Sequence, residues 1–197
     1  MSKTRFPKLP PLVPCRGGKL SQTLFKQLFL AQGWQLKGEF PNLPKAVAII
    51  SPHTSNIDAW LGFNALLGLG IQITIFGKDS LFRTPLKPIL EWIGVVPVVR
   101  DTPQGHTRQI VDVINKTDRI WVGMAPEGSR KAPEKIRSGF YHIAKAANVP
   151  IVLMYANSKT KQGGIFGKIY PTDLAHDLAL IKQLYKENVG LDIIIPE

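Results

Sequence analysis

A histidine and an aspartate lie five positions apart in the segment His53-Thr54-Ser55-Asn56-Ile57-Asp58. Apolar runs at 46–50 and 59–61 flank the segment, which predicts a histidine at a strand end and an aspartate in the first turn of a helix. The positive end of the helix dipole keeps such a carboxylate charged. One imidazole nitrogen of His53 could then bind Asp58 while the other faces a substrate hydroxyl, the arrangement of a general base.

The other interpretation of this pair is structural, with His53 as a capping or packing histidine and Asp58 as an ordinary first-turn acid. A single pair at this spacing arises by chance. The remaining histidines, at positions 106, 142 and 176, show no comparable placement at a strand end with an acid in reach.

A second polar cluster, Glu127-Gly128-Ser129-Arg130, follows the apolar run 120–124. The cluster offers backbone donors at Gly128, a hydroxyl at Ser129 and a guanidinium at Arg130 that can hold a phosphate through two hydrogen bonds. Charged Gly-Ser segments are also common turns, so the cluster alone leaves both interpretations open. Its position after a strand, like that of His53, predicts a single site at one edge of a sheet.

Several other chemistries lack their sequence signals. There is no Gly-x-Ser-x-Gly, no Gly-x-x-x-x-Gly-Lys-Ser/Thr, no His-Glu-x-x-His and no Gly-x-Gly-x-x-Gly. The single cysteine, Cys15, excludes an internal disulfide and any multi-cysteine metal site. We therefore expect no covalent nucleophile, no metal and no cofactor.

Strand-like and helix-like stretches alternate along most of the 197 residues. This alternation predicts an α/β fold with a mostly parallel central sheet flanked by helices. Expected strands are 47–50, 71–76, 95–99 with Pro97 marking an edge or bulge, 119–124, 150–155, 165–170 as a hairpin partner, and 191–195. Expected helices run from Ser21 as N-cap to about Trp34, over 57–67, from Thr84-Pro85 to about Gly94, and over 107–115, 140–147 and 174–185.

The N-terminal region carries most of the positive charge. Residues 1–45 hold eight Lys or Arg against one acid, Glu39, and account for +7 of the net +11. Residues 1–20 form a basic, Pro-rich arm, and residues 21–197 are expected to form one domain. The helix after Ser21 either docks on the core or lies on a membrane. Anionic partners are expected, either phosphates of nucleic acid or a membrane surface.

No run approaches the roughly 20 apolar residues that cross a bilayer, and the Pro-rich N-terminus does not look like a secretory signal. The expected location is cytoplasmic, soluble or peripheral to the membrane.

At these residues the chain resembles the glycerolipid acyltransferases typified by bacterial 1-acylglycerol-3-phosphate acyltransferases. Four blocks carry the resemblance over residues 45–155: the H-x-x-x-x-D block at 53–58, the second block from 78–81 through 94–100, Pro126-Glu127-Gly128-Ser129-Arg130, and 149–152. Ser129 replaces the usual threonine, Ala125 a frequent aromatic residue, and Leu153 a common proline.

The resemblance implies a glycerol-3-phosphate acyltransferase-like fold and assigns roles to these residues. His53 would deprotonate the acceptor hydroxyl, Asp58 would orient His53, and the acceptor phosphate site would consist of Arg100, Glu127, Gly128, Ser129 and Arg130. The acyl donor would be a thioester of coenzyme A or acyl carrier protein, and the acceptor a lysolipid, 1-acyl-sn-glycerol-3-phosphate, reached at an anionic membrane surface.

Two alternatives remain open on the sequence. The acceptor could be another lysolipid, for example one that contains an amino acid. The protein could also be a non-enzymatic binder of anionic membrane or nucleic acid, although nucleic acid is not an expected partner because that function gives no reason for His53 and Asp58 to meet.

Overall fold

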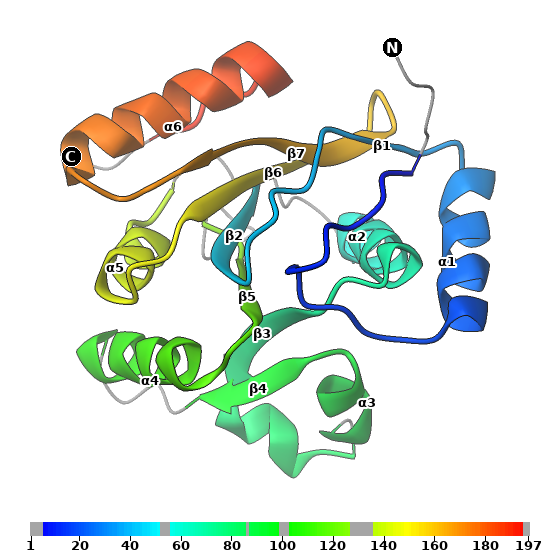
Figure 1. The fold of residues 1–197 in the computed structure, drawn as a ribbon, viewed down its shortest axis with the longest axis horizontal. Helices are drawn as coiled ribbons and strands as arrows, with labels where there is room; N and C mark the ends of the chain where they lie inside the picture. Colours follow the sequence, from blue (N-terminus) through cyan, green and yellow to red (C-terminus); the bar gives the residue numbers. More distant parts are fainter. Residues whose placement is uncertain (1–5, 52–55, 86, 99–102, 127–135, 195–197) are drawn as a thin grey trace.

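One central sheet organises the chain in the computed structural model, which describes residues 6–51, 56–85, 87–98, 103–126 and 136–194 (Figure 1). For residues 56–61, 78, 81, 103 and 104 only the backbone is described. Within these residues the sheet has seven strands in the order β1-β7-β6-β2-β5-β3-β4. The strands are β1 (Gln35–Lys37), β2 (Lys45–Ser51), β3 (Ile73–Lys78), β4 (Val95–Val98), β5 (Ile120–Met124), β6 (Ile151–Asn157) and β7 (Gln162–Ile169).

Five strands run parallel to one another, and β7 and β1 run the opposite way because β7 returns from β6 as a hairpin. The helices are α1 (Lys19–Ala31), α2 (Asn56–Leu69), α3 (Lys87–Trp92), α4 (Pro103–Lys116), α5 (Gly139–Ala146) and α6 (Leu174–Val189), with a 3-10 helix η1 (Asp79–Arg83). The predicted α/β fold with a mostly parallel, helix-flanked sheet is therefore confirmed.

The two faces of the sheet are packed differently. Val47 and Ile49 of β2 point toward α4, α5 and α6 and lie in the largest apolar cluster, with Ile114, Phe140 and Ile181. Ala46 and Ala48 point to the other face, where α2 and residues 6–18 cover the strands. Alternate side chains of a strand point to opposite faces of the sheet. The alternation of small and large residues in β2 therefore gives one face smaller side chains than the other.

On the second face, α1 packs against α2 through a third apolar cluster. Phe29 of α1 is buried with Phe6, Trp34 and Ala65, and the rings of Phe29 and Phe6 meet edge to face with centroids 5.7 Å apart. Residues 6–18 contribute no helix, but Val13 is buried against the sheet. Of the two expectations for α1, the structure shows a helix docked on the core, with its outer face exposed.

Three local expectations were wrong. Gly18, not Ser21, is the N-cap of α1, because the Arg16 N–H donates to the Gly70 carbonyl and holds the chain in place for an earlier start. Thr84-Pro85 does not open a helix, since a turn closed by Lys87 N–H to Thr84 O precedes α3. Residues 191–193 form no strand, and the Ile194 carbonyl accepts from Ile136 N–H.

The edge position predicted from Pro97 is confirmed, since β4 is the outermost strand of the sheet that the described residues form. The sequence interpretation missed β1, whose three residues are too few to show a period.

Candidate active site

The carboxyl ends of β2 and β5 lie side by side. Ile49 of β2 pairs with Met124 of β5 in parallel register, and Ser51 ends β2. The chain therefore leaves both strands at the same edge of the sheet. In open parallel sheets this edge is where ligands bind.

Helix α2 begins at Asn56, five residues beyond the end of β2, with its N-terminus at this edge. Asp58 is its third residue, so the backbone places the aspartate in the first turn as the sequence predicts. The positive end of the helix dipole there stabilises a carboxylate. His53 lies outside the described residues, and so does the side chain of Asp58.

The other predicted site residues follow strands that end at the same edge. Arg100 comes two residues after β4, and Glu127, Gly128, Ser129 and Arg130 come after β5. All five lie outside the described residues. Their roles therefore remain predictions that rest on strand order and on the resemblance.

Both ends of the segment that contains Glu127 to Arg130 are held by hydrogen bonds. Pro126 is buried, and its carbonyl accepts from Arg137 N–H at 2.8 Å. Ile136 N–H in turn donates to the Ile194 carbonyl at 2.9 Å. The two ends of the segment are thus fixed next to each other at the carboxyl end of β5.

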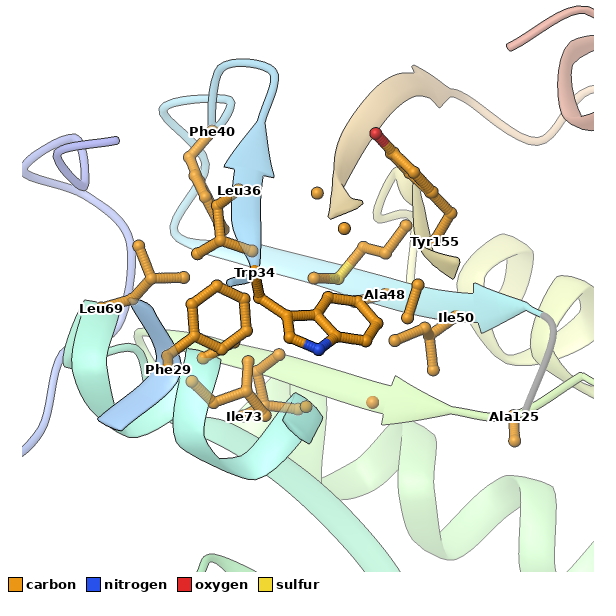
Figure 2. A pocket seen from close by; sticks show the side chains of 18 of the residues that line it. Phe29, Trp34, Leu36, Phe40, Ala48, Ile50, Leu69, Ile73, Ala125 and Tyr155 are labelled. Atoms are coloured by element: carbon orange, nitrogen blue, oxygen red, sulfur yellow. The ribbon is translucent and has the colours of Figure 1, made fainter. Parts of the chain in front are cut away.

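An apolar cavity of about 270 Å³ lies under α2 and reaches this edge (Figure 2). Its lining extends from Phe29 and Trp34 near β1, across the sheet, to Ile50 and Ala125 at the ends of β2 and β5. Figure 2 shows the Trp34 indole lying across the strands, with Ile50 and Ala125 beyond it toward the edge. Ile50 is three residues before His53, and Ala125 is two before Glu127.

Small residues create this space. Ala48 of β2 and Gly123 of β5 face α2, where the opposite face of the same strands carries Ile49 and Val122. A Cβ at Gly123 would come within 2.5 Å of the Ile73 side chain, so this position admits only glycine without a shift. At Gly62 of α2, by contrast, a Cβ would meet no atom within 4 Å.

Among the lining residues that the structure describes, none has a charged side chain. Trp34 and Tyr155 carry the only polar side-chain groups among them, and burial raises the pKa of Tyr155 above its usual value, which favours the neutral hydroxyl. A wall of this kind suits an aliphatic chain. Solvent reaches the cavity at its edge side, where Ala125 is exposed and Ile75 is 43% exposed.

Sequence reasoning placed the polar site but missed the cavity. Its signal was present in the alternation Ala46-Val47-Ala48-Ile49 and in Gly123 before the end of β5, which mark one sheet face as shallow. The contribution of Trp34 and Phe29 had no such signal, because these residues come from an element distant in sequence.

Comparison with known proteins agrees with this arrangement. The family description "Acyltransferase" matches residues 37–156, which include the predicted site. The fold is similar to the crystal structure of PlsC, the 1-acyl-sn-glycerophosphate acyltransferase from Thermotoga maritima, with a TM-score of 0.57 and 16% identity over 86% of this chain and 75% of that one. No curated protein matches the sequence.

In the part of the chain that the structure describes, no helix is both long and apolar enough to cross a bilayer.

The family match covers more than half of the chain and contains both strand ends that form the site. The predicted membership of an acyltransferase family is confirmed, since the chain belongs to the acyltransferase family and shares the fold of PlsC.

Proposed function

We propose that this acyltransferase moves a fatty acyl group from a thioester of coenzyme A or acyl carrier protein to the free hydroxyl of a lysolipid. The proposed acceptor is 1-acyl-sn-glycerol-3-phosphate, which places the reaction in phospholipid biosynthesis. The structure of PlsC, a lysophosphatidic acid acyltransferase, supports this choice of acceptor through its shared fold.

The observation that carries the proposal is the apolar cavity that meets the carboxyl ends of β2 and β5. A fatty acyl chain in this cavity would have its carbonyl end near Ile50 and Ala125, where the chain continues toward His53 and Glu127. Binding of nucleic acid without catalysis would not require an apolar cavity at the carboxyl ends of the parallel strands.

In the proposed reaction His53 takes the proton of the acceptor hydroxyl as the hydroxyl oxygen attacks the thioester carbonyl. The carbon–oxygen bond forms, the carbon–sulfur bond breaks, and the proton on His53 passes to the departing thiolate. Asp58 holds the second imidazole nitrogen and stabilises the imidazolium. The backbone donors of Gly128 and the cations Arg100 and Arg130 bind the acceptor phosphate.

The acceptor and the product are membrane lipids, so the proposal includes peripheral binding to the cytoplasmic face of a membrane. The excess of basic residues over residues 1–45 supports attraction to an anionic surface.

The direct test is to incubate the purified protein with a labelled long-chain acyl-CoA, or with acylated carrier protein, and a panel of lysolipids, and to identify products by mass. The panel includes lysophosphatidic acid, other lysophospholipids and a lysolipid that contains an amino acid. We expect the fastest transfer to lysophosphatidic acid, and transfer slower by about 10²–10⁴-fold for His53→Ala, because that is the rate that a general base contributes.

The other outcomes are equally informative. Preference for the amino-acid lysolipid would keep the reaction and change the acceptor. Full activity of folded His53→Ala would refute His53 as the base. Salt-sensitive binding to nucleic acid with no transfer to any acceptor would favour the non-enzymatic alternative.

A further inference from the structure

The outer face of α1 is apolar although it faces solvent. Leu20, Leu24 and Leu28 recur every four residues, are all exposed, and Leu20 has 90% of its surface accessible. The remaining exposed residues of α1 are Lys19, Thr23, Gln27 and Ala31, so the face has one cation and no acid. The opposite side of the helix is occupied, since Phe29 packs against α2.

The exposed face of a helix in this protein need not be apolar, as helix α6 shows. The outer face of α6 presents Gln183, Lys186 and Glu187, as expected for a helix that packs on one side only. A contiguous exposed apolar stripe on a folded domain marks an interaction surface.

Helix α3 extends the apolar surface at the same end of the molecule. Ile89 and Trp92 are both exposed, Trp92 at 55%. Arg16, three residues before α1, donates to the Trp92 carbonyl and lies over the Trp92 ring at 5.4 Å from its centroid. The acid on α3, Glu91, is 3.8 Å from Lys87 and is neutralised by it.

The surface borders the open side of the cavity. The Trp92 ring lies 6.2 Å from Phe63 of α2, next to Gly62 in the cavity lining. Ile75, which lines the cavity, is itself exposed. Helix α1 forms one wall, with Phe29 toward the cavity and the leucines away from it. Figure 1 shows α1, α2 and α3 together on one side of the sheet, opposite α5 and α6.

We propose that Leu20, Leu24 and Leu28 of α1 with Ile89 and Trp92 of α3, here called the docking face, insert into the surface of an anionic lipid bilayer. Leucine and tryptophan side chains suit the boundary between headgroups and acyl chains. Arg16 and Lys19 lie beside the face and match anionic headgroups. Docking in this way brings the opening of the cavity near the lipid.

The inference rests on the proposed function in one respect, that the substrate resides in a bilayer. Its test measures co-sedimentation with vesicles of phosphatidylcholine, alone or mixed with an equal amount of phosphatidylglycerol. We expect binding to the mixed vesicles, weaker binding to neutral ones, and loss of binding as salt is added. The variant Leu20→Glu/Leu24→Glu should bind at least about tenfold more weakly, because it removes two inserted side chains and adds two anions.

The matched control is Tyr170→Glu/Ile194→Glu. It makes the same charge change at apolar residues that are 58% and 50% exposed and lie outside the docking face. We expect the control to bind within about twofold of wild type, since only its long-range charge effect remains. Both variants change exposed positions, and unchanged thermal unfolding confirms that each is folded.

Equal vesicle binding by wild type and the Leu20→Glu/Leu24→Glu variant would overturn the inference. So would dimerisation of the lipid-free wild type that this variant abolishes, because the face would then be covered by a second copy of the chain. Acyl transfer with detergent-dispersed acceptor separates the two proposals. Activity there without face-dependent vesicle binding refutes only the docking face, and face-dependent binding without activity refutes only the proposed function.

Discussion

Some residues would take part in the proposed reaction, and others determine the shape of the apolar cavity. Asp58 lies in the first turn of α2, where the helix N-terminus favours a carboxylate. Gly62, one turn further on, lines the cavity and leaves it open. In the proposed reaction, the residue that would orient the base and a residue that lines the acyl-chain cavity thus lie on the same helix.

Replacing Gly62 by leucine tests the cavity as the acyl-chain site. A Cβ at Gly62 meets open space, and Gly62 lines the cavity, so we expect the new side chain to occupy part of the cavity. We expect long-chain donors to lose about tenfold in kcat/KM while short-chain donors are little affected, since each displaced methylene is worth about 0.8 kcal/mol. A series of acyl-CoA donors of increasing length measures this.

Gly139→Leu is the control, because Gly139 is also helical and also has no atom near an added Cβ, but lies outside the cavity. Both substitutions favour helix formation, so a loss of stability does not explain the result. An unchanged chain-length profile for Gly62→Leu would contradict the assignment.

Arg130→Ala tests the acceptor phosphate site. Loss of one charge-assisted hydrogen bond costs about 1.5–3 kcal/mol, so KM for lysophosphatidic acid should rise about ten- to a hundredfold while KM for the donor changes little. Steady-state kinetics with each substrate varied in turn measures the difference. Transfer to a monoacylglycerol, which has no phosphate, serves as the control, and equal rises in both KM values would argue against this role.

At the scale of elements, a buried carboxylate joins α5 to α6. Asp177 of α6 accepts from the hydroxyl of Tyr141 at 2.9 Å and from the backbone N–H of Thr172 at 2.6 Å. Burial opposes ionisation of Asp177, but these hydrogen bonds outweigh it and lower the pKa of Asp177 below its usual value. Burial, then the bond to Asp177, raises the pKa of Tyr141 to about 12.

These two shifts predict how the stability of the protein depends on pH. A lowered carboxyl pKa stabilises the fold above the unfolded pKa of about 4, and this is lost as pH falls through the lower folded value. The raised phenol pKa stabilises the fold below about pH 10, and this is lost as pH rises toward 12.

We expect Tyr141→Phe to lower the free energy of unfolding at pH 7 by about 1–3 kcal/mol. The loss of stability at alkaline pH should become smaller, and the loss of stability at acid pH should begin at a higher pH. Urea unfolding at several pH values measures all three effects. Tyr170→Phe, at an exposed tyrosine, is the control. If both variants showed the same pH profile as wild type, the bond between Tyr141 and Asp177 would not contribute to stability.

A second tyrosine links α6 to the sheet. The Tyr185 hydroxyl donates to the Met154 carbonyl at 2.8 Å, next to the register shift between β6 and β7 at Leu153/Met154. A register shift leaves backbone groups without their ladder partners. The buried hydroxyl of Tyr185 gives the Met154 carbonyl a hydrogen bond beside this shift, and so holds α6 against β6.

At the scale of the whole molecule, the basic N-terminal arm is packed onto the domain. Cys15 bridges to Ile71 beside β3, and the backbone of Arg16 binds that of Gly70. Arg119 donates to the carbonyl of Pro11 at 3.0 Å. Residues that the sequence marks as an extended arm therefore cover part of one sheet face.

Val13→Ala tests this packing. Val13 is buried among residues of the sheet, so the substitution should lower the free energy of unfolding by about 1–2 kcal/mol through lost burial and a small cavity. Leu12→Ala, at the neighbouring exposed position, should cost less than about 0.5 kcal/mol. Denaturant unfolding of the two variants measures the difference, and equal values would show that residues 6–18 do not contribute to the folded domain.

The sequence by itself determined the alternation of strands and helices and the edge position of β4. It also determined that His53, Asp58 and Glu127 follow the ends of strands. These follow from local periodicity and from the rule that parallel strands present their carboxyl ends together. The boundaries at Ser21 and 191–195 failed because backbone hydrogen bonds to distant residues, such as Arg16 to Gly70, influence where an element starts. The boundary at Thr84 failed because a local turn from Thr84 to Lys87 precedes the helix.

Only the tertiary structure decided which small residues face the same space and which leucines stay exposed. The cavity needs Phe29 and Trp34 to close against Gly123 and Met154, residues separated by about half of the chain. The apolar period of α1 predicts one buried face, but its packing against α2 determines that Phe29 turns inward and Leu20 and Leu24 outward. Burial depends on which surfaces meet in space, and a local pattern carries no information about that.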